Sequence, residues 1–211
     1  VLTFSRANRG VYLCILAISW FWLVGAAFVA QFPNYTKMIL GGDETVVTLL
    51  LATFSIGIAV GSAMCSTLLK GKITVRYVPL AAFGISVAIT DVYLASQGMM
   101  RDTDALIGAW RFFQQGGWRI VADLFILAVC GGIFVVPLYA YMQHHSEVAH
   151  RARVIAANNI MNACFMVISS FGALMMLQLS FSVPEIFLLL AGCTALVACL
   201  LKRKIKSGVL S

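Results

Sequence analysis

Residues 10–32 read "GVYLCILAISWFWLVGAAFVAQF", a run that carries no charged side chain and is apolar on every side. A helix needs roughly 20 mainly apolar residues to cross about 30 Å of hydrocarbon, and this run is long enough. It lacks the short apolar core and following cleavage site of a signal peptide, so we expect it to stay in the protein. The stretch therefore predicts a transmembrane helix.

The composition of the whole chain agrees with a membrane environment. Of 211 residues, 61% are hydrophobic and only 11% are charged, whereas soluble domains carry about a quarter charged residues. The predicted spans are residues 10–32, 46–69, 77–100, 120–143, 154–178 and 184–201. We expect one all-α bundle of six transmembrane helices over residues 1–211.

Lysine and arginine gather at one set of span ends. That set holds Arg6, Arg9, Lys70, Lys72, Arg76, Arg151, Arg153, Lys202, Arg203, Lys204 and Lys206, and the other set holds Lys37, Arg101, Arg111 and Arg119. Cytoplasmic connections carry the excess of basic residues, so both ends of this segment are predicted to be cytoplasmic. Arg76, Arg151 and Arg153 would then hold helix ends at the cytoplasmic surface. The net charge of +7 is a topology signal and does not indicate nucleic-acid binding.

Both ends of the sequence are basic and neither resembles a natural terminus. The chain starts at Val1, has the leader "FSRANRG" (residues 4–10) and finishes with "KRKIKSGVLS" (residues 202–211). We expect a fragment of a longer polypeptide.

The stretch "HRARVIAANNIMNACFMVISS" (residues 150–170) carries three amides inside an apolar run: Asn158, Asn159 and Asn162. At 100° per residue the three lie within about 100° of arc, and Ser169 continues the stripe. Polar side chains in a membrane face the bundle interior or a water-filled cavity. We favour a cavity wall. The alternative is hydrogen bonding between helices, which contributes about 0.6 kcal/mol per contact.

Two other spans contain residues that shape helices. Gly57 and Gly61 are four residues apart, a spacing that lets two membrane helices approach closely. Pro137 follows Gly131 and Gly132 in the fourth span, and a proline there predicts a kink, because it removes a backbone hydrogen bond. A kinked helix beside a polar one is how transporters build sites near the midplane.

Asp91 and Asp123 are the candidates for energy coupling. Asp91 lies about 22 Å along its helix from Arg76, so it either reaches the external interface or forms a proton or headgroup site. Asp123 follows Arg119 by four residues, and the two are predicted to pair on one helix. The longest connection, residues 101–119, is predicted to hold a short helix flat on the outer surface, ending at Gly116 and Gly117.

No signature of catalysis or of metal binding stands in the sequence. The six cysteines lie within predicted spans without a CxxC pair, and the histidines, His144, His145 and His150, share one short turn. Hydrolase, P-loop and metalloprotease motifs are missing. We predict no enzyme activity in this chain, no cofactor and no metal site.

The turn "GSAMCSTLLKGKITVR" (residues 61–76) resembles the G-x-x-x-D-R-x-G-R-R loop of the major facilitator superfamily. Gly61 and the basic residues match, but Cys65 stands where that family has its acid. The salt-bridge role of the acid therefore does not carry over. With six spans and both ends inside, the chain looks like one half of such a transporter.

Residues 131–170, "GGIFVVPLYAYMQHHSEVAHRARVIAANNIMNACFMVISS", resemble the bacterial lysophospholipid transporter branch, including forms fused to a glycerophospholipid acyltransferase and an acyl-carrier-protein ligase. The resemblance implies the C-terminal half, partnered by an N-terminal half of six helices. It implies flipping of lysophospholipids across the bacterial inner membrane for re-acylation, by alternating access. It also places Asp91 on a peripheral helix.

On this resemblance the substrate path would be lined from the fourth and fifth spans. Its residues would be Pro137, Tyr139, Asn158, Asn159, Asn162 and Met166. A lysolipid has a polar headgroup and one acyl chain, so its path needs a polar stripe beside an apolar surface. Two alternatives stay open: an exporter of drugs or metabolites with the same fold, and a membrane anchor that holds acyltransferase domains without transporting anything.

Overall fold

The computed structural model describes residues 9–69, 73–99 and 106–210. Six long helices make up most of it: α2 (Arg9–Asn34), α3 (Glu44–Leu69), α4 (Val78–Gln97), α6 (Trp118–His144), α7 (Arg151–Gln178) and α8 (Val183–Lys206). All six are long and apolar enough to cross a membrane. The predicted all-α architecture with six membrane-spanning helices is confirmed.

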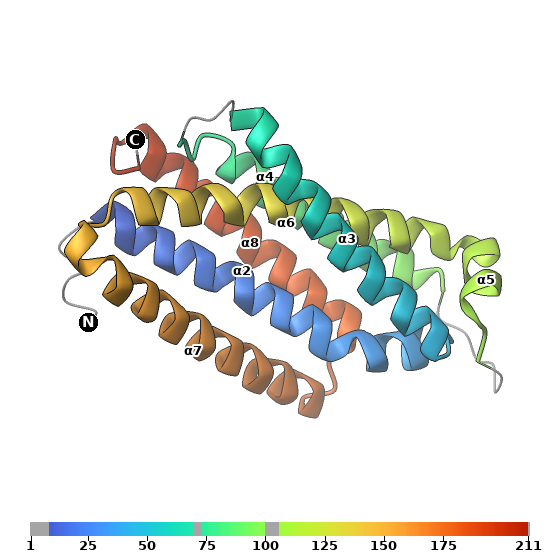
Figure 1. Ribbon diagram of the computed structural model, residues 1–211. Coiled ribbons are helices and arrows are strands. Elements are labelled where there is room, and N and C mark those ends of the chain that lie inside the picture. The colour runs from blue at the N-terminus through green and yellow to red at the C-terminus, as the bar shows by residue number, and fades with distance from the viewer. Residues whose placement is uncertain (1–8, 70–72, 100–105, 211) are drawn as a thin grey trace.

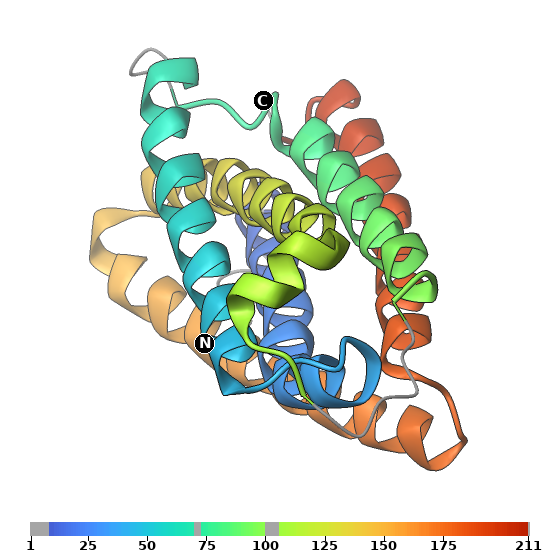
Figure 2. The same cartoon turned by 90° about the vertical axis from the view of Figure 1, so that its right-hand side faces the viewer.

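The helices lie side by side as an elongated bundle (Figure 1). Seen from its end, α2 and α6 lie in the middle, with α3 and α7 on one side and α4 and α8 on the other (Figure 2). α2 packs on α7 and α6, α6 packs on α3 and α4, and α4 packs on α8. We call the end where α2 begins and α8 finishes the basic end, and the opposite one the α5 end.

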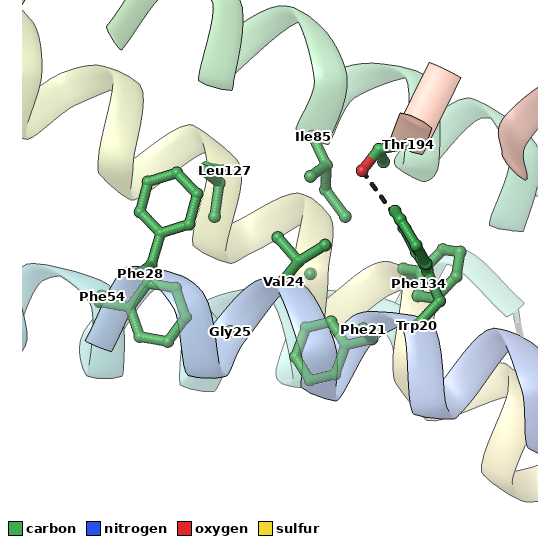
Figure 3. A pocket seen from close by; sticks show the side chains of 11 residues that line it. Trp20, Phe21, Val24, Gly25, Phe28, Phe54, Ile85, Leu127, Phe134 and Thr194 are labelled. Carbon is green, nitrogen blue, oxygen red and sulfur yellow. Dashed lines mark hydrogen bonds between the residues drawn. The ribbon is translucent and has the colours of Figure 1, made fainter. Parts of the chain in front are cut away.

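The centre of the bundle is filled by aromatic and aliphatic side chains. Phe28 of α2 stacks on Phe187 of α8 with 4.0 Å between ring centroids. Beside them lies an apolar cavity of about 20 Å³, at whose edge Trp20 donates a hydrogen bond of 3.2 Å to Thr194 (Figure 3). Such a volume holds about one water molecule.

The closest helix contact joins α3 to α6 through glycines. A Cβ added at Gly61 would lie 2.1 Å from the carbonyl oxygen of Val129, and one added at Gly132 would lie 2.6 Å from the backbone nitrogen of Ser62. Without side chains at these positions the two backbones touch, which is how small residues hold membrane helices together.

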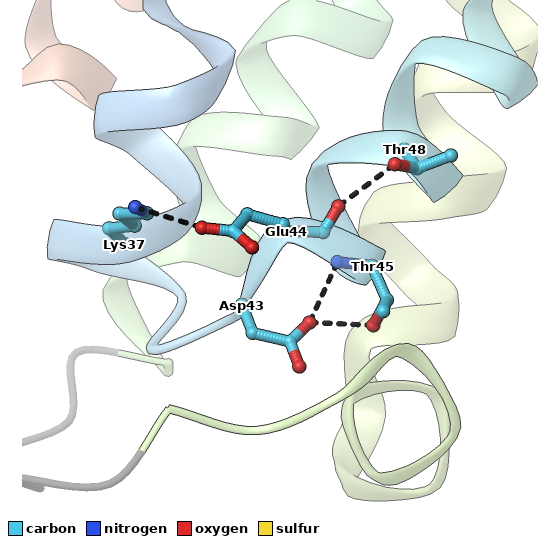
Figure 4. Close-up of polar contacts among 5 residues, drawn as sticks. All are labelled: Lys37, Asp43, Glu44, Thr45 and Thr48. Atoms are coloured by element: carbon cyan, nitrogen blue, oxygen red, sulfur yellow. Dashed lines mark hydrogen bonds and ion pairs between the residues drawn. The ribbon is translucent and has the colours of Figure 1, made fainter.

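The connection between α2 and α3 is fastened to the segment before α6 at the α5 end. The amide of Asp43 donates to Ile107 O at 3.0 Å, and Ile107 N donates to Gly41 O at 2.8 Å. Asp43 Oδ1 also accepts hydrogen bonds from the amide and hydroxyl of Thr45, while Lys37 and Glu44 form an ion pair at 3.6 Å (Figure 4). The side chain of Asp43 thereby caps the start of α3.

The predicted short helix within residues 101–119 is present in the described part: α5 (Ala109–Phe112) continues into the π-helical turn η2 (Phe113–Gly117). Non-helical angles at Gln115 and Gly116 end it before α6 begins, and its flat position on the outer surface stays a prediction. Gly116 adopts φ +98°, and the ring of Phe112 occupies the space where Gly117 would carry a side chain. The two glycines therefore redirect the chain into α6.

We predict that Gly61→Ala and Gly132→Ala destabilise the bundle by about 1–3 kcal/mol, because each methyl group must push α3 and α6 apart. The shift would be measured as the midpoint of unfolding in mixed detergent micelles. Gly25→Ala is the matched control, since nothing lies within 4 Å of its added Cβ. An equal decrease of the unfolding midpoint in all three variants would contradict the close packing of α3 on α6.

A second prediction concerns Asp43, which lies outside the membrane-spanning helices. The hydrogen bond from the Thr45 hydroxyl lowers the pKa of the Asp43 carboxyl from its usual value. A lowered pKa means that the cap stabilises the fold above about pH 4 and is lost as pH falls through the folded value. Asp43→Ala should lower the unfolding midpoint at pH 7 and lose its effect in strong acid. The same difference at both pH values would argue against the cap.

Candidate functional site

Polar side chains from three helices meet where α2, α6 and α7 converge. The hydroxyl of Tyr139 accepts from Trp22 Nε1 at 3.2 Å, from Asn158 Nδ2 at 3.5 Å and from Asn162 Nδ2 at 3.4 Å. Ser19 Oγ donates to Asn162 Oδ1 at 2.9 Å. We call Ser19, Trp22, Tyr139, Asn158 and Asn162 the amide network.

The Asn162 amide makes a more complete set of bonds when its oxygen and nitrogen exchange places. Its nitrogen then donates to Asn158 O at 3.1 Å and to Ser19 Oγ at 2.9 Å. Its oxygen accepts from Trp22 Nε1 at 3.3 Å and from Asn158 Nδ2 at 3.1 Å. Asn162 is bonded to Ser19 in both orientations, while its bond to Tyr139 is replaced by bonds to Asn158 and Trp22. The side-chain oxygen of Asn158 is buried and has no donor among the described residues.

The helical period of α7 explains why these residues meet. Its buried positions form one stripe: Val154, Ala157, Asn158, Asn162, Ser169 and Ala173. This stripe faces α2, where Ser169 Oγ donates to Leu23 O at 2.8 Å. The hydrogen bonding between helices that the sequence left open as an alternative is therefore present at Asn162 and Ser169.

Asn159 lies apart from this stripe. It is exposed, whereas Asn158 is fully buried and Asn162 is 7% exposed. The expected single face thus holds for Asn158 and Asn162 and not for Asn159, because one residue step turns the side chain by about 100°.

The outer side of α7 is apolar and uncovered. Only 17% of the apolar span of this helix is buried. Met166 is exposed, together with Ile160, Val167, Ile168, Phe171 and Leu174. The amide network therefore lies beside an open apolar surface, and Asn159 lies on the open part of the helix.

The remaining predicted path residue and the predicted anchors lie in different places. Pro137 is buried in α6, two residues before Tyr139. Arg151 begins α7, Arg153 lies two residues further on, and Arg76 lies two residues before the start of α4, so all three lie at the basic end.

Asp91 and Arg119 form an ion pair between α4 and α6. Arg119 Nε donates to Asp91 Oδ2 at 3.1 Å, and its terminal nitrogen binds the other carboxylate oxygen. The predicted pairing of Arg119 with Asp123 is therefore wrong. Arg119 lies in the first turn of α6, where its side chain reaches sideways to α4, and a planar guanidinium matches a carboxylate in two bonds.

Asp123 is buried beside this pair. It is 8% exposed, and its Oδ2 has no partner among the described residues. Its carboxyl group lies within hydrogen-bonding reach of Asp91. The two acids thus belong to one cluster near the α5 end, away from the amide network.

Sequence reasoning missed the contribution of α2 to the network. Ser19 is the one hydroxyl side chain of serine or threonine in residues 10–32, which was a usable signal. Nothing in the sequence marked Trp22 as a hydrogen-bond donor to another helix, since tryptophan also serves as an apolar membrane residue.

We predict a small favourable coupling between Asp91 and Arg119 in a double-mutant cycle with alanine. The pair is half exposed, with side-chain exposures of 34% and 48%, so solvent weakens it. Unfolding in detergent micelles would supply the four free energies. A cycle between Arg119 and Asp123 should give a smaller coupling. A larger coupling for Arg119 with Asp123 than with Asp91 would show that Arg119 pairs with Asp123 after all.

Comparison with known proteins gives one distant relative to report. The chain is 24% identical over 137 residues to the lysophospholipid transporter LplT of Photorhabdus laumondii subsp. laumondii. The match covers 64% of this chain and 29% of the relative, so it spans less than a third of that transporter's length. No family model matches the chain, and no solved structure matches it.

Proposed function

We propose that this chain is the C-terminal half of a lysophospholipid transporter of the major facilitator superfamily. Paired with an N-terminal half of six helices, it flips lysophospholipid across the bacterial inner membrane for re-acylation. The substrate class is supported by the distant relative, whose name states lysophospholipid transport. The amide network beside the open face of α7 is the observation that carries the proposal.

The chemistry of the network suits a phospholipid headgroup. Amide and hydroxyl groups bind phosphate oxygens or an ammonium group through hydrogen bonds without placing a fixed charge in the membrane. The buried side-chain oxygen of Asn158 finds no donor among the described residues, and such a group costs free energy until a donor reaches it. A headgroup amine or a water molecule would supply that donor.

The open face of α7 suits the acyl chain and the second half. Membrane helices that bury little of their surface face lipid or another helix bundle, and α7 contacts mainly α2. With the N-terminal half opposite this face, Asn159 and Met166 would line the space between the halves. Methionine adapts to irregular apolar shapes, which fits acyl chains of different lengths.

Alternating access would rock the two halves about this space. Asp91 and Asp123 are the candidates for coupling that motion to an ion or proton, because Oδ2 of Asp123 is buried and has no partner in the part of the chain that the structure describes. They lie at the α5 end, which the positive-inside rule places outside. Both ends of this segment are then cytoplasmic, and so are Arg76, Arg151 and Arg153.

Uptake of radiolabelled lysophosphatidylethanolamine into spheroplasts tests the proposal with the full-length protein. We predict that Asn158→Ala and Asn162→Ala each reduce the initial rate at least tenfold, since each removes hydrogen-bonding groups from the headgroup path. The amount of protein in the membrane should stay unchanged.

Ser169→Ala is the matched control, because it removes a hydrogen bond between α7 and α2 outside the network. It should keep most of the uptake. Equal loss in Ser169→Ala would mean that the asparagines only hold the helices together. Absence of uptake above a null strain would favour an exporter of another substrate, and re-acylation of external lysolipid that survives both asparagine changes would favour a membrane anchor.

A further inference from the structure

A groove between α4 and α8 lies on the side of the bundle away from α3 and α7 (Figure 2). Its volume is about 470 Å³, within the range of small-molecule sites. The lining residues are Arg76, Pro79, Leu80, Phe83, Ala198, Cys199, Lys202, Ile205 and Lys206. We call it the α4–α8 groove. It shares no residue with the amide network.

The groove combines an apolar floor with a basic rim. Leu80 and Phe83 of α4 are 69% and 55% exposed, so they offer a surface for acyl chains. Ala198 precedes Lys202 by one helical turn, which places the floor about 6 Å deeper in the membrane than that charge. This arrangement, with charge at the membrane surface and apolar side chains deeper in the membrane, fits an amphipathic ligand whose charged end lies at the surface.

The rim is positive without a neutralising acid. Arg76, Lys202 and Lys206 are exposed, and no ion pair joins them to a carboxylate within residues 9–69, 73–99 and 106–210. None of the described residues that line the groove is an acid either. Three cations attract a phosphate group and can donate hydrogen bonds to it. The ammonium group of a zwitterionic lipid finds no carboxylate among these lining residues.

We propose that the α4–α8 groove binds an anionic phospholipid, with its phosphate among Arg76, Lys202 and Lys206 and an acyl chain along Leu80 and Phe83. The lipid is retained on the outer surface of the half and is not the transported substrate. Basic pockets between membrane helices recognise anionic headgroups in this way. That the lipid comes from the cytoplasmic leaflet rests on the orientation proposed above.

Native mass spectrometry of the full-length protein, released from nanodiscs of equal phosphatidylglycerol and phosphatidylcholine, tests this site. The unmodified protein should retain phosphatidylglycerol in preference to phosphatidylcholine. The triple variant Arg76→Gln/Lys202→Gln/Lys206→Gln should weaken retention on the order of 100-fold, since each cation near the membrane contributes about fivefold.

Two further variants separate a built site from general attraction. Arg9→Gln/Arg203→Gln/Lys204→Gln removes the same charge at the same end outside the groove, and it should retain the lipid. Cys199→Trp fills the groove while keeping every charge, and it should displace the lipid. Equal loss in both triple variants, or retention unchanged in Cys199→Trp, would overturn the proposal.

The source of the phosphate is tested with soluble glycerophosphoglycerol, which carries the headgroup without acyl chains. Millimolar concentrations should leave the bound lipid in place, because the apolar floor contributes to binding. Displacement at such concentrations would show a site for free phosphate esters and would contradict a lipid site. None of these readouts depends on transport, so they stand or fall separately from the proposed function.

Discussion

Hydrocarbon contains no partner for a hydrogen bond, and this constraint governs the structure at every level. Backbone groups satisfy it by forming six long helices. Side chains satisfy it by meeting one another between helices. The amide of Asn162 and the hydroxyl of Ser19 find each other across α7 and α2, and Arg119 finds Asp91 across α6 and α4. Among the described residues, one side-chain oxygen each of Asn158 and Asp123 is buried without a protein partner.

Different helix pairs of the bundle are held together by different kinds of contact. α3 is joined to α6 by glycines that let the backbones touch, and α2 is joined to α8 by stacked aromatic rings. α7 is different, because polar side chains attach it to α2 and most of its apolar surface stays open. Apolar contacts of Val154, Ala157 and Ala173 accompany these polar ones along the buried stripe of α7.

The six membrane-spanning helices could be predicted from the sequence, because a helix that crosses a membrane needs a run of about 20 mainly apolar residues. The sequence also placed Asn158, Asn162 and Ser169 on one side of α7, since that follows from 3.6 residues per turn. It could not tell which helix that side meets. Periodicity describes one helix at a time, so Ser19 and Trp22 were missed and Arg119 was assigned to its own helix. The end of the short helix at Gly116 and Gly117 was predicted from the two glycines. The ring of Phe112 over Gly117 was not, because it is a tertiary contact.

We propose that lysolipid passes along the open face of α7 beside the amide network. A lysophosphatidylethanolamine analogue with a photoreactive group in its acyl chain tests it most directly in the full-length protein. After illumination and digestion, we predict labelled peptides from α7 around Met166 and from α2 around Trp22, and loss of the label when unmodified lysolipid competes. Competed label confined to α4 and α8 would contradict the account.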